Sequence, residues 1–465
     1  MGAGGARGRG GRVAVVGAGP AGLMAAERLA AAGRAVELWE RRPSPGRRLL
    51  LAGRGGLNLT HSEGEAAFLA RYAAAGGGGA DAVSAAVAAF GCGEGVRRWA
   101  RDRLGVPTFV GSSGRVFPEG MRAAPLLRAW LAVLEEAGVE LRLRRRLVGV
   151  ASGPGGRGLR LDFREETAGG ALGPTMEHWE GQACVLALGG ASYPRLGSDG
   201  AWAGEGGSAL RGEPCKSRER PMLDVVPLRP ANCGWVAGGG GWSPVFREKY
   251  EGSWAKGVEL SVVGPTGDSL ARSRGDLVFS ARGVEGGPVY AVTGALASAA
   301  RASSRGGITV HIDFRPDMDV HALTKRLSAS RKRSTAERLR RAGVASAAYG
   351  LLVESGGREG AAATAQGGAA ALAAAVKKVP LFLDGPEGLE KAISTAGGVS
   401  VGAGPGQVAA GTLMLQGKPE GIFVAGEQLD WNAPTGGYLL TAALATGAAA
   451  AAGVDAWLKN ENASI

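Results

Sequence analysis

The sequence predicts an α/β fold in which both ends of the chain build one parallel β-sheet, with an antiparallel β-barrel and a helical domain inserted between them. Short apolar segments that end in glycine, typical of buried parallel strands, occur at Arg12–Gly17 and again at Gly421–Glu427. Between them, residues 221–313 form short alternating segments broken by Gly and Pro, which is typical of antiparallel strands. The two ends are therefore expected to meet in one domain.

The length of 465 residues exceeds what one hydrophobic core usually organises, so two or three domains are expected. We predict that residues 1–212 and 381–465 form the sheet domain in two parts. Residues 213–315 are predicted to form the β-rich barrel domain, and residues 316–380 the helical domain. Within the helical domain, the Gly/Ala-rich stretch at residues 356–368 predicts a loop.

Local patterns define the individual elements. Residues 12–17, Leu23–Ala32 and Ala35–Glu40 have the patterns of strand, helix and strand, which is one βαβ unit. A helix, a strand, a hairpin and a buried strand follow at Pro125–Ala137, Val139–Val150, residues 157–182 and Ala183–Leu188. The inserted strands are predicted at Val225–Leu228, Val258–Val263, Leu277–Ser280 and Ile308–Phe314. Glycine runs at residues 76–79 and 238–241 are predicted to be flexible surface insertions without a chemical role.

The turn after the first strand has the spacing GxGxxG, formed by Gly17, Gly19 and Gly22. In this motif the first glycine permits a tight turn, the second lets a diphosphate approach the backbone, and the third lets helix and strand pack closely. Glu40 ends the second strand about 20 residues further on, where a carboxylate accepts hydrogen bonds from ribose hydroxyls. The adenosine half of FAD or NAD is therefore predicted to bind at Gly17, Gly19, Pro20, Ala21, Gly22, Glu40 and Arg41.

The far end of the chain favours FAD over NAD. There a strand ends in Gly426 and Glu427, and a turn at Gly436 and Gly437 opens a helix of small residues that reaches Gly453. A carboxylate at such a strand end can bind ribityl hydroxyls, and helix N-terminal amides can face the flavin ring, where negative charge develops on reduction. NAD has no comparable requirement.

Three further stretches, together with the glycine turn and Glu40, resemble a known family. They are Gly46–His61, Ala187–Pro194, and Ala392–Val399 with Gly426–Tyr438. On these stretches the chain resembles the bacterial-type NAD(P)/FAD-dependent oxidoreductase flavoproteins that include aminoacetone oxidase. The resemblance spans nearly the whole chain. It implies FAD as the cofactor, in a Rossmann-like FAD-binding domain with an inserted antiparallel β-barrel domain and a helical domain.

The resemblance also implies roles for individual residues. It places Arg47, Arg48, Gly55, Gly56, Asn58 and Thr60 in a loop along the flavin, and Gly426, Glu427, Gly436, Gly437 and Tyr438 in the closing segment. Gly189, a further predicted cofactor contact, stands where relatives often have threonine. The flavin loop suits its place by itself, because glycines admit close contact with a flat ring and an arginine can neutralise diphosphate or reduced flavin.

The pattern names no general acid or base. His61 and Tyr438 are the candidates within motifs that face the flavin, and Tyr193, Asp430 and Trp431 are further ones. Because a flavin carries the redox step itself, proton transfer needs little from the protein. The sequence therefore predicts an FAD-dependent oxidoreductase acting on a small substrate, such as an amine or aminoketone. NAD(P)H or oxygen is the candidate redox partner, although no second GxGxxG between a strand and a helix predicts a dedicated nicotinamide domain.

The formal net charge of +12 and the pI near 9.9 raise an alternative, an FAD-containing tRNA/RNA- or protein-binding factor with a structural flavin. The basic residues are spread along the chain, however, and the densest run, residues 331–341, has the spacing of a solvated helix face. Nucleic acid is therefore not the expected partner.

The cysteines Cys92, Cys184, Cys215 and Cys233 lie far apart, which argues against a zinc site, a disulfide framework and the dithiol of flavin disulfide reductases. We expect no metal and a reducing, cytoplasmic setting, with an organelle as the alternative if the Arg-rich residues 1–12 are a targeting remnant. No uninterrupted stretch of about 18 strongly apolar residues occurs, so we expect a soluble protein without a membrane contact.

Overall fold

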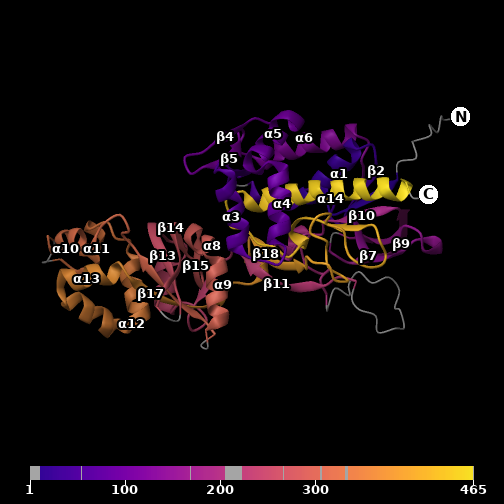
Figure 1. Cartoon of the computed structure of the whole chain (residues 1–465). Helices are drawn as coiled ribbons and strands as arrows, with labels where there is room; N and C mark the ends of the chain where they lie inside the picture. The colour runs from indigo at the N-terminus through magenta and orange to yellow at the C-terminus, as the bar shows by residue number, and fades with distance from the viewer. Residues whose placement is uncertain are drawn as a thin grey trace. The chain divides into compact units, whose positions relative to one another are not determined.

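A computed structural model of the chain describes residues 11–53, 55–167, 169–204, 222–264, 267–303, 306–329 and 333–463. The chain divides into two compact units, Met1–Arg229 with Ser394–Ile465, and Pro230–Ile393. In Figure 1 the first unit therefore combines the indigo start of the chain with its yellow end. This confirms that both ends of the chain build one domain around an inserted one.

A parallel sheet of five strands forms the centre of the first unit, in the order β19-β10-β1-β2-β6. The strands are β1 (Arg12–Val16), β2 (Ala35–Glu40), β6 (Glu140–Leu143), β10 (Ala183–Leu186) and β19 (Ile422–Val424). β1 pairs with β2 on one side and with β10 on the other, and β19, from the end of the chain, pairs with β10. The sheet therefore changes direction at β1, where Rossmann-like folds bind their nucleotides.

Helices surround this sheet, and two of them come from opposite ends of the chain. The helices are α1 (Pro20–Ala31), α2 (Arg47–Ala52), α3 (Glu65–Ala75), α4 (Ala80–Phe90), α5 (Cys92–Leu104), α6 (Ala123–Glu136) and α14 (Tyr438–Ala463). The yellow α14 runs beside the indigo α1 in Figure 1, and the two helices are in contact. The last helix therefore packs against the first one.

α14 is longer than the sequence pattern suggested. It has 26 residues, and its stretch Tyr438–Glu461 has a mean hydropathy of 1.5, so by length and composition it meets the requirement for crossing a membrane. Half of that stretch is buried, however, through packing against α1, α4 and the sheet. These are the contacts of a core helix.

Three smaller sheets complete the first unit. They comprise β3 (Thr60–His61), β4 (Thr108–Val110) and β5 (Arg115–Pro118); β7 (Arg145–Ser152), β8 (Leu159–Glu166) and β9 (Leu172–Gly181); and β11 (Val225–Ala231) with β18 (Ser394–Val399).

The prediction of one strand at Val139–Val150 is wrong, because Arg144 has a left-handed φ of 58° that turns the chain between two sheets. β6 joins the parallel sheet, whereas β7 pairs antiparallel with β8.

The second unit is a closed antiparallel barrel in the order β12-β15-β14-β13-β16-β17, with helices. The strands are β12 (Trp235–Ala237), β13 (Trp254–Val263), β14 (Ser269–Phe279), β15 (Gly283–Gly286), β16 (Ile308–Asp313) and β17 (Val379–Pro386). The helices are α7 (Pro244–Tyr250), α8 (Gly287–Ala291), α9 (Thr293–Ala302), α10 (Val320–Ser328), α11 (Thr335–Arg341), α12 (Ala347–Gln366) and α13 (Gly368–Val376). The barrel and its helices bury one continuous apolar core.

The domain borders differ from the predicted ones. Residue 381, the predicted start of the closing part, lies within β17, whose pairing with β16 and β12 closes the barrel. Residues 381–393 therefore belong to the second unit, which also holds the helices predicted as a separate domain. The predicted border at residue 212 and Cys215 lie outside the described residues.

The loop predicted at residues 356–368 is wrong, because α12 continues through it to Gln366. Alanine has the highest helix propensity, and Ala348 and Leu351 of the same helix are buried in the core of the second unit. These terms outweigh the glycines, each of which costs about 1 kcal/mol relative to alanine. In the basic run, Arg338 is also buried rather than solvated, and its Nε donates to the carbonyl of Leu327 at 3.3 Å.

The glycine run at residues 76–79 is packed rather than flexible. The amide of Gly79 donates to the carbonyl of Asp430 at 2.7 Å, and the amide of Gly78 donates to the Asp430 carboxylate at 2.7 Å. A Cβ on Gly77 would lie 2.7 Å from the Cα of Trp431. The run therefore holds the closing segment at a distance that no side chain would permit. The run at residues 238–241 lies at the surface as predicted: no atom lies within 4 Å of the Cβ positions of Gly239 and Gly240, and the amide of Gly240 donates to Asp384 at 2.8 Å.

Candidate functional site

The nucleotide turn between β1 and α1 requires its glycines for different reasons. Gly17 has φ of 103°, and a Cβ there would lie 2.3 Å from the carbonyl oxygen of Ala187. A Cβ on Gly22 would lie 1.8 Å from the carbonyl oxygen of Gly17. Around Gly19, in contrast, no atom lies within 4 Å of the Cβ position. The two outer glycines thus allow the turn, and the middle one leaves an open space at the N-terminus of α1 where an anion is favoured.

Glu40 stands at the end of β2 beside this turn. Its two carboxylate oxygens accept hydrogen bonds from the amides of Ala18 at 2.9 Å and Arg42 at 2.8 Å. Burial raises the pKa of Glu40 above its ordinary value, despite these two hydrogen bonds and the nearby arginines. The carboxylate is therefore fixed in place at the strand end, with acceptor capacity left for ribose hydroxyls.

The closing segment lies directly against the start of α1. A Cβ on Gly447, in α14, would lie 2.2 Å from the carbonyl oxygen of Ala21. A Cβ on Gly426, after β19, would lie 2.8 Å from the Cβ of Ala21. The two ends of the sequence thus approach each other at Ala21 more closely than side chains would permit.

The start of α14 is held against the predicted flavin loop in the same way. Gly437 has φ of 97°, and a Cβ there would lie 2.4 Å from the Cα of Thr60. The hydroxyls of Thr60 and Thr441 are 2.8 Å apart and form a buried hydrogen bond.

Part of the predicted flavin loop has regular secondary structure. Residues Arg47–Ala52 form α2 after Gly46, whose φ of 66° sets the turn into this helix. Thr60 and His61 form β3.

Arg48 and Glu427 form an ion pair at the junction of four chain segments. Glu427, in the short 3-10 helix η5 (Gly426–Gln428), also accepts from the amides of Thr395 at 2.9 Å and Gly190 at 3.2 Å. Arg48, in α2, also donates to the hydroxyls of Ser192 at 2.9 Å and Ser198 at 3.2 Å. This junction fixes a charged pair at the predicted flavin end of the site.

Three of the residues at that junction were missed by sequence reasoning: Ser192, Ser198 and Thr395. Ser192 and Thr395 fall within stretches that carry the family resemblance, so position in those stretches was the available signal. Ser198 lies four residues beyond the second of these stretches and gave no signal of its own.

Buried polar atoms without partners show where the site fits a cofactor. Within the described ranges, Arg47 Nε, Asn58 Oδ1 and Gln428 Nε2 are buried and have no hydrogen-bond partner. Such atoms cost free energy unless something bonds to them. Together with the open space at Gly19, they fit a large polar ligand such as FAD.

His61 and Tyr438, the candidate acid–base residues, are both engaged within the protein. Nδ1 of His61 accepts from the amide of Glu63 at 3.2 Å, and its Nε2 lies 3.1 Å from the carbonyl of Ser113, to which it donates. The hydroxyl of Tyr438 donates to Glu63 at 2.6 Å, and burial followed by this hydrogen bond raises the pKa of Tyr438. Both side chains therefore already make hydrogen bonds within the protein.

The further candidates lie in two places. The Asp430 carboxylate accepts from the amide of Gly78, and the Trp431 indole donates to the carbonyl of Gly426 at 2.7 Å. Tyr193 has a left-handed φ of 58° at the start of a 3-10 helix after β10. Of the remaining predicted cofactor contacts, a Cβ on Gly189 would lie 3.2 Å from Ser198 Oγ, and Arg41 forms ion pairs with Glu166 and Asp199. Over the part of the chain that the structure describes, no group of three His, Cys, Asp or Glu side chains is arranged to hold a metal ion.

A family model matches nearly the whole chain. Residues 11–453 match the family described as HI0933-like protein Rossmann domain. No curated protein matches the chain significantly. Among solved structures, the chain is similar to a 3-ketosteroid-delta4-(5alpha)-dehydrogenase from Rhodococcus jostii RHA1, at 15% identity, with 96% of both chains covered and a TM-score of 0.46.

Two further structures illustrate the range of similarity. A 3-ketosteroid delta1-dehydrogenase from Sterolibacterium denitrificans is 12% identical over 97% of this chain and 100% of that one, with a TM-score of 0.46. THI4 from Thermovibrio ammonificans is 20% identical over 38% of this chain and 57% of its own, with a TM-score of 0.27. At these TM-scores the solved structures support no conclusion about activity.

Substituting Gly19 with alanine tests the open space at the turn. Gly19 has φ of −82°, and its Cβ position is free of contacts, so Gly19→Ala is expected to keep the wild-type melting temperature. The methyl group occupies space that the diphosphate needs, so the dissociation constant of FAD is expected to rise roughly tenfold or more. Titration of apoprotein with FAD measures this constant. Gly169→Ala, equally free of contacts, is the control; an unchanged affinity in Gly19→Ala would contradict the assignment.

The pH dependence of FAD affinity tests Glu40. Ribose hydroxyls donate to the ionised carboxylate, so FAD binding weakens as the pH falls through the Glu40 pKa, which burial has raised. The loss is therefore expected to begin at a higher pH than for an ordinary glutamate. Glu40→Gln, nearly the same shape, should lose this step. If the variant shows the same step as wild type in FAD titrations across that pH range, another group is responsible.

Proposed function

The chain belongs to the HI0933-like Rossmann-domain family, and we propose that it is an FAD-dependent oxidoreductase whose substrate is a small amine or aminoketone. The observation that carries the FAD site is the meeting of the nucleotide turn and the closing segment at Ala21. When bound, FAD supplies the two-electron acceptor, which no side chain of the protein can provide.

The state of His61 and Tyr438 supports an amine over an alcohol. An alcohol must give its hydroxyl proton to a base as a hydride leaves the adjacent carbon, and neither residue is free to take it. A neutral amine needs no such base. Its α-carbon would lose a hydride to the two-electron acceptor that FAD supplies, and the nitrogen lone pair would form an iminium ion. Water would then convert this ion to a carbonyl compound and an ammonium ion.

The protein contributes positive charge at the end of the site where electrons arrive. The N-terminus of α14 lies directly after Gly436 and Gly437, and helix N-termini favour negative charge. Arg48 lies at the same end of the site in an ion pair with Glu427, which balances its charge. The helix N-terminus is therefore the feature that favours the uptake of negative charge there.

We further propose oxygen or a nicotinamide nucleotide as the second redox partner. The support is that, among the described residues, the GxGxxG at Gly17–Gly22 opens an α-helix after a strand, whereas the second GxGxxG, at Gly153–Gly158, joins the antiparallel strands β7 and β8. A nicotinamide would therefore have to bind at the flavin face itself.

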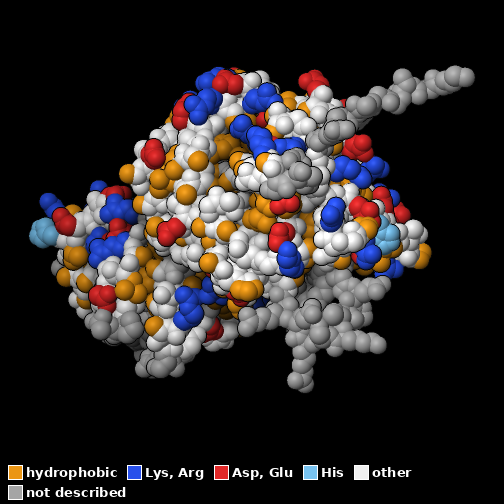
Figure 2. Space-filling view, turned by 45° about the vertical axis from the view of Figure 1, so that its right-hand side comes forward, with side chains coloured by type: hydrophobic (Ala, Val, Ile, Leu, Met, Phe, Trp, Pro, Cys, Tyr) orange, Lys and Arg blue, Asp and Glu red, His pale blue; other side chains and the backbone are white. Residues whose placement is uncertain are grey.

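The alternative of an RNA- or protein-binding factor rests on the net charge of +12. On the face drawn in Figure 2, however, Lys and Arg side chains lie among Asp and Glu side chains rather than in one continuous basic patch. Several arginines are paired, among them Arg274 with Glu259 and Arg340 with Glu337. This distribution favours the oxidoreductase.

Anaerobic mixing tests the substrate class. The yellow protein would be mixed with primary amines, with aminoacetone, and with hydroxyacetone, which has a hydroxyl in place of the amino group. We expect the visible flavin absorbance to bleach with amines and aminoketones, faster as the pH rises toward the pKa of the amine, and not with hydroxyacetone. Oxygen should then restore the colour. Bleaching by hydroxyacetone as well as aminoacetone, or no bleaching with any amine, would contradict the proposed substrate class. Bleaching by NADH or NADPH would identify a nicotinamide nucleotide as the second redox partner.

A further inference from the structure

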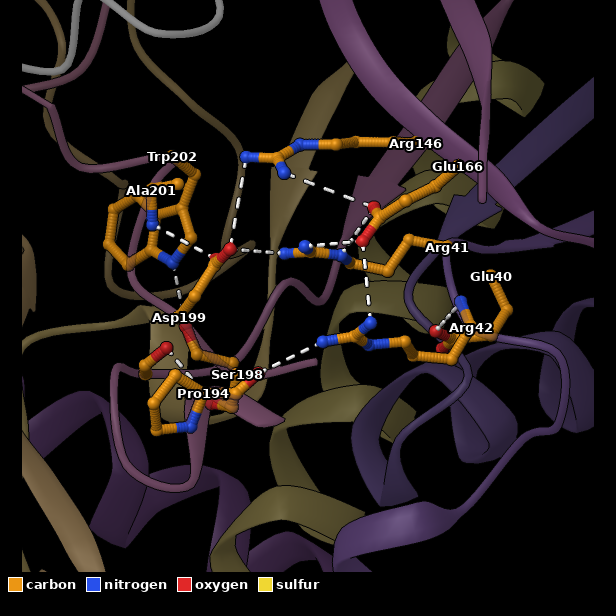
Figure 3. Close-up of polar contacts among 12 residues, drawn as sticks. Glu40, Arg41, Arg42, Arg146, Glu166, Pro194, Ser198, Asp199, Ala201 and Trp202 are labelled. Carbon is orange, nitrogen blue, oxygen red and sulfur yellow. Dashed lines mark hydrogen bonds and ion pairs between the residues drawn. The ribbon is translucent and has the colours of Figure 1, made fainter. Parts of the chain in front are cut away.

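The side chain of Arg41 is fully engaged by two carboxylates (Figure 3). Its Nε and Nη2 donate to the two oxygens of Glu166 at 2.9 and 2.8 Å, and its Nη1 donates to Asp199 at 2.6 Å. The three side chains are 17%, 1% and 27% exposed. A bidentate contact of this kind is among the stronger ion pairs. Arg41 was predicted to bind the cofactor, yet its charge is already balanced within the protein.

The two carboxylates come from different parts of the first unit. Glu166 ends β8, in the sheet formed by β7, β8 and β9, whereas Asp199 lies in residues 189–202, the segment that follows β10. Arg146, on β7, lies 3.9 Å from Glu166 and 3.8 Å from Asp199. Figure 3 shows these groups converging between the two parts. Arg41 therefore joins the segment 189–202 to a neighbouring sheet.

Arg42 adds a second contact to the same segment. Its Nη2 donates to the carbonyl of Pro194 at 3.0 Å, and its Nη1 lies 3.5 Å from Glu166. Gly197 has φ of 107°, and a Cβ there would lie 3.0 Å from the Cγ of Arg42. Arg41 and Arg42 follow Glu40 directly, so the adenosine end of the site and the segment 189–202 are held together.

The same segment also contacts the flavin end. The hydroxyl of Ser198, next to Asp199, donates to the carbonyl of Gly190 at 2.9 Å and accepts from Arg48. The amide of Gly190 in turn donates to Glu427. Burial opposes the ionisation of Asp199, but the hydrogen bond and charge of Arg41 outweigh it and lower the pKa of Asp199. Asp199 thus joins the segment 189–202 to Arg41, whereas Ser198 and Gly190 join it to Arg48 and Glu427.

We infer that Arg41 is a positioning residue that, through Asp199 and Glu166, holds the segment 189–202 in place and so couples the adenosine end of the FAD site to its flavin end. Arg41, Arg42 and Arg146 all pair with Glu166 or Asp199 within the protein, so the cluster is a connection rather than an anion site. The inference rests on FAD binding at this site and on no property of the substrate.

Asp199→Asn is the main test, because it keeps the shape of a part-exposed side chain and removes only the charge. Losing one charge-assisted hydrogen bond is expected to raise the dissociation constant of FAD roughly tenfold. Arg41→Lys keeps the charge but cannot form hydrogen bonds with both carboxylates. It should therefore raise the dissociation constant of FAD to a similar degree. The double variant should be no weaker than the weaker single one, because both remove the same connection. Glu177→Gln, in the Arg145 ion pair of the neighbouring sheet, is the control and should bind FAD as wild type does.

The visible spectrum of bound FAD gives the second readout, since it reports the environment of the flavin ring. Asp199→Asn and Ser198→Ala are expected to shift it alike, although Asp199 contacts the adenosine side. If Arg41→Lys weakens FAD binding while Asp199→Asn binds FAD as wild type does, Arg41 contacts the cofactor itself and the inference is wrong. Weaker binding with an unchanged flavin spectrum would also overturn the coupling. A wild-type protein that takes up no FAD would instead overturn the FAD site.

Discussion

The site depends on the close approach of backbone to backbone around the start of α1. Ala21 lies against Gly426 and Gly447, two residues from the far end of the chain, and Gly22 lies against Gly17 of its own turn. No side chain fits at any of these glycines, because the added Cβ would overlap a neighbour. The first and last segments are therefore held at one distance, and everything that binds between them takes its geometry from that distance.

An oriented carboxylate stands at each end of the site that this approach creates. At the adenosine end, Glu40 is fixed by backbone amides, and at the flavin end Glu427 is fixed by Thr395, Gly190 and Arg48. Each carboxylate thus enters the site already oriented. Arg47, Asn58 and Gln428 still contribute buried atoms without partners in the described structure. A pre-oriented frame with a few unsatisfied atoms binds a large ligand without reorganising first.

Much of the fold follows from local sequence pattern. The GxGxxG turn, the βαβ unit and the returning strand near Gly421 each carry their own signal, and the parallel sheet confirms them. Failures occur where the decisive term is not local. Arg144 turns the chain although nothing in its neighbours predicts it, and α12 persists across glycines because it packs in the core of the second unit. The run Gly76–Gly79 is indistinguishable in sequence from a flexible loop, and only its partner Asp430, far along the chain, makes it rigid.

The same distinction explains the site. Residues of motifs were predictable, but Glu166, Ser198 and Asp199 act through partners more than a hundred residues away, so no spacing rule identifies them. The most direct test of the account is a crystal structure of the protein reconstituted with FAD. The account predicts one FAD per chain, with its diphosphate at Gly19 and its ring beside Gly436 and Gly437. FAD bound elsewhere, or Ala21 separated from Gly426 and Gly447, would contradict it.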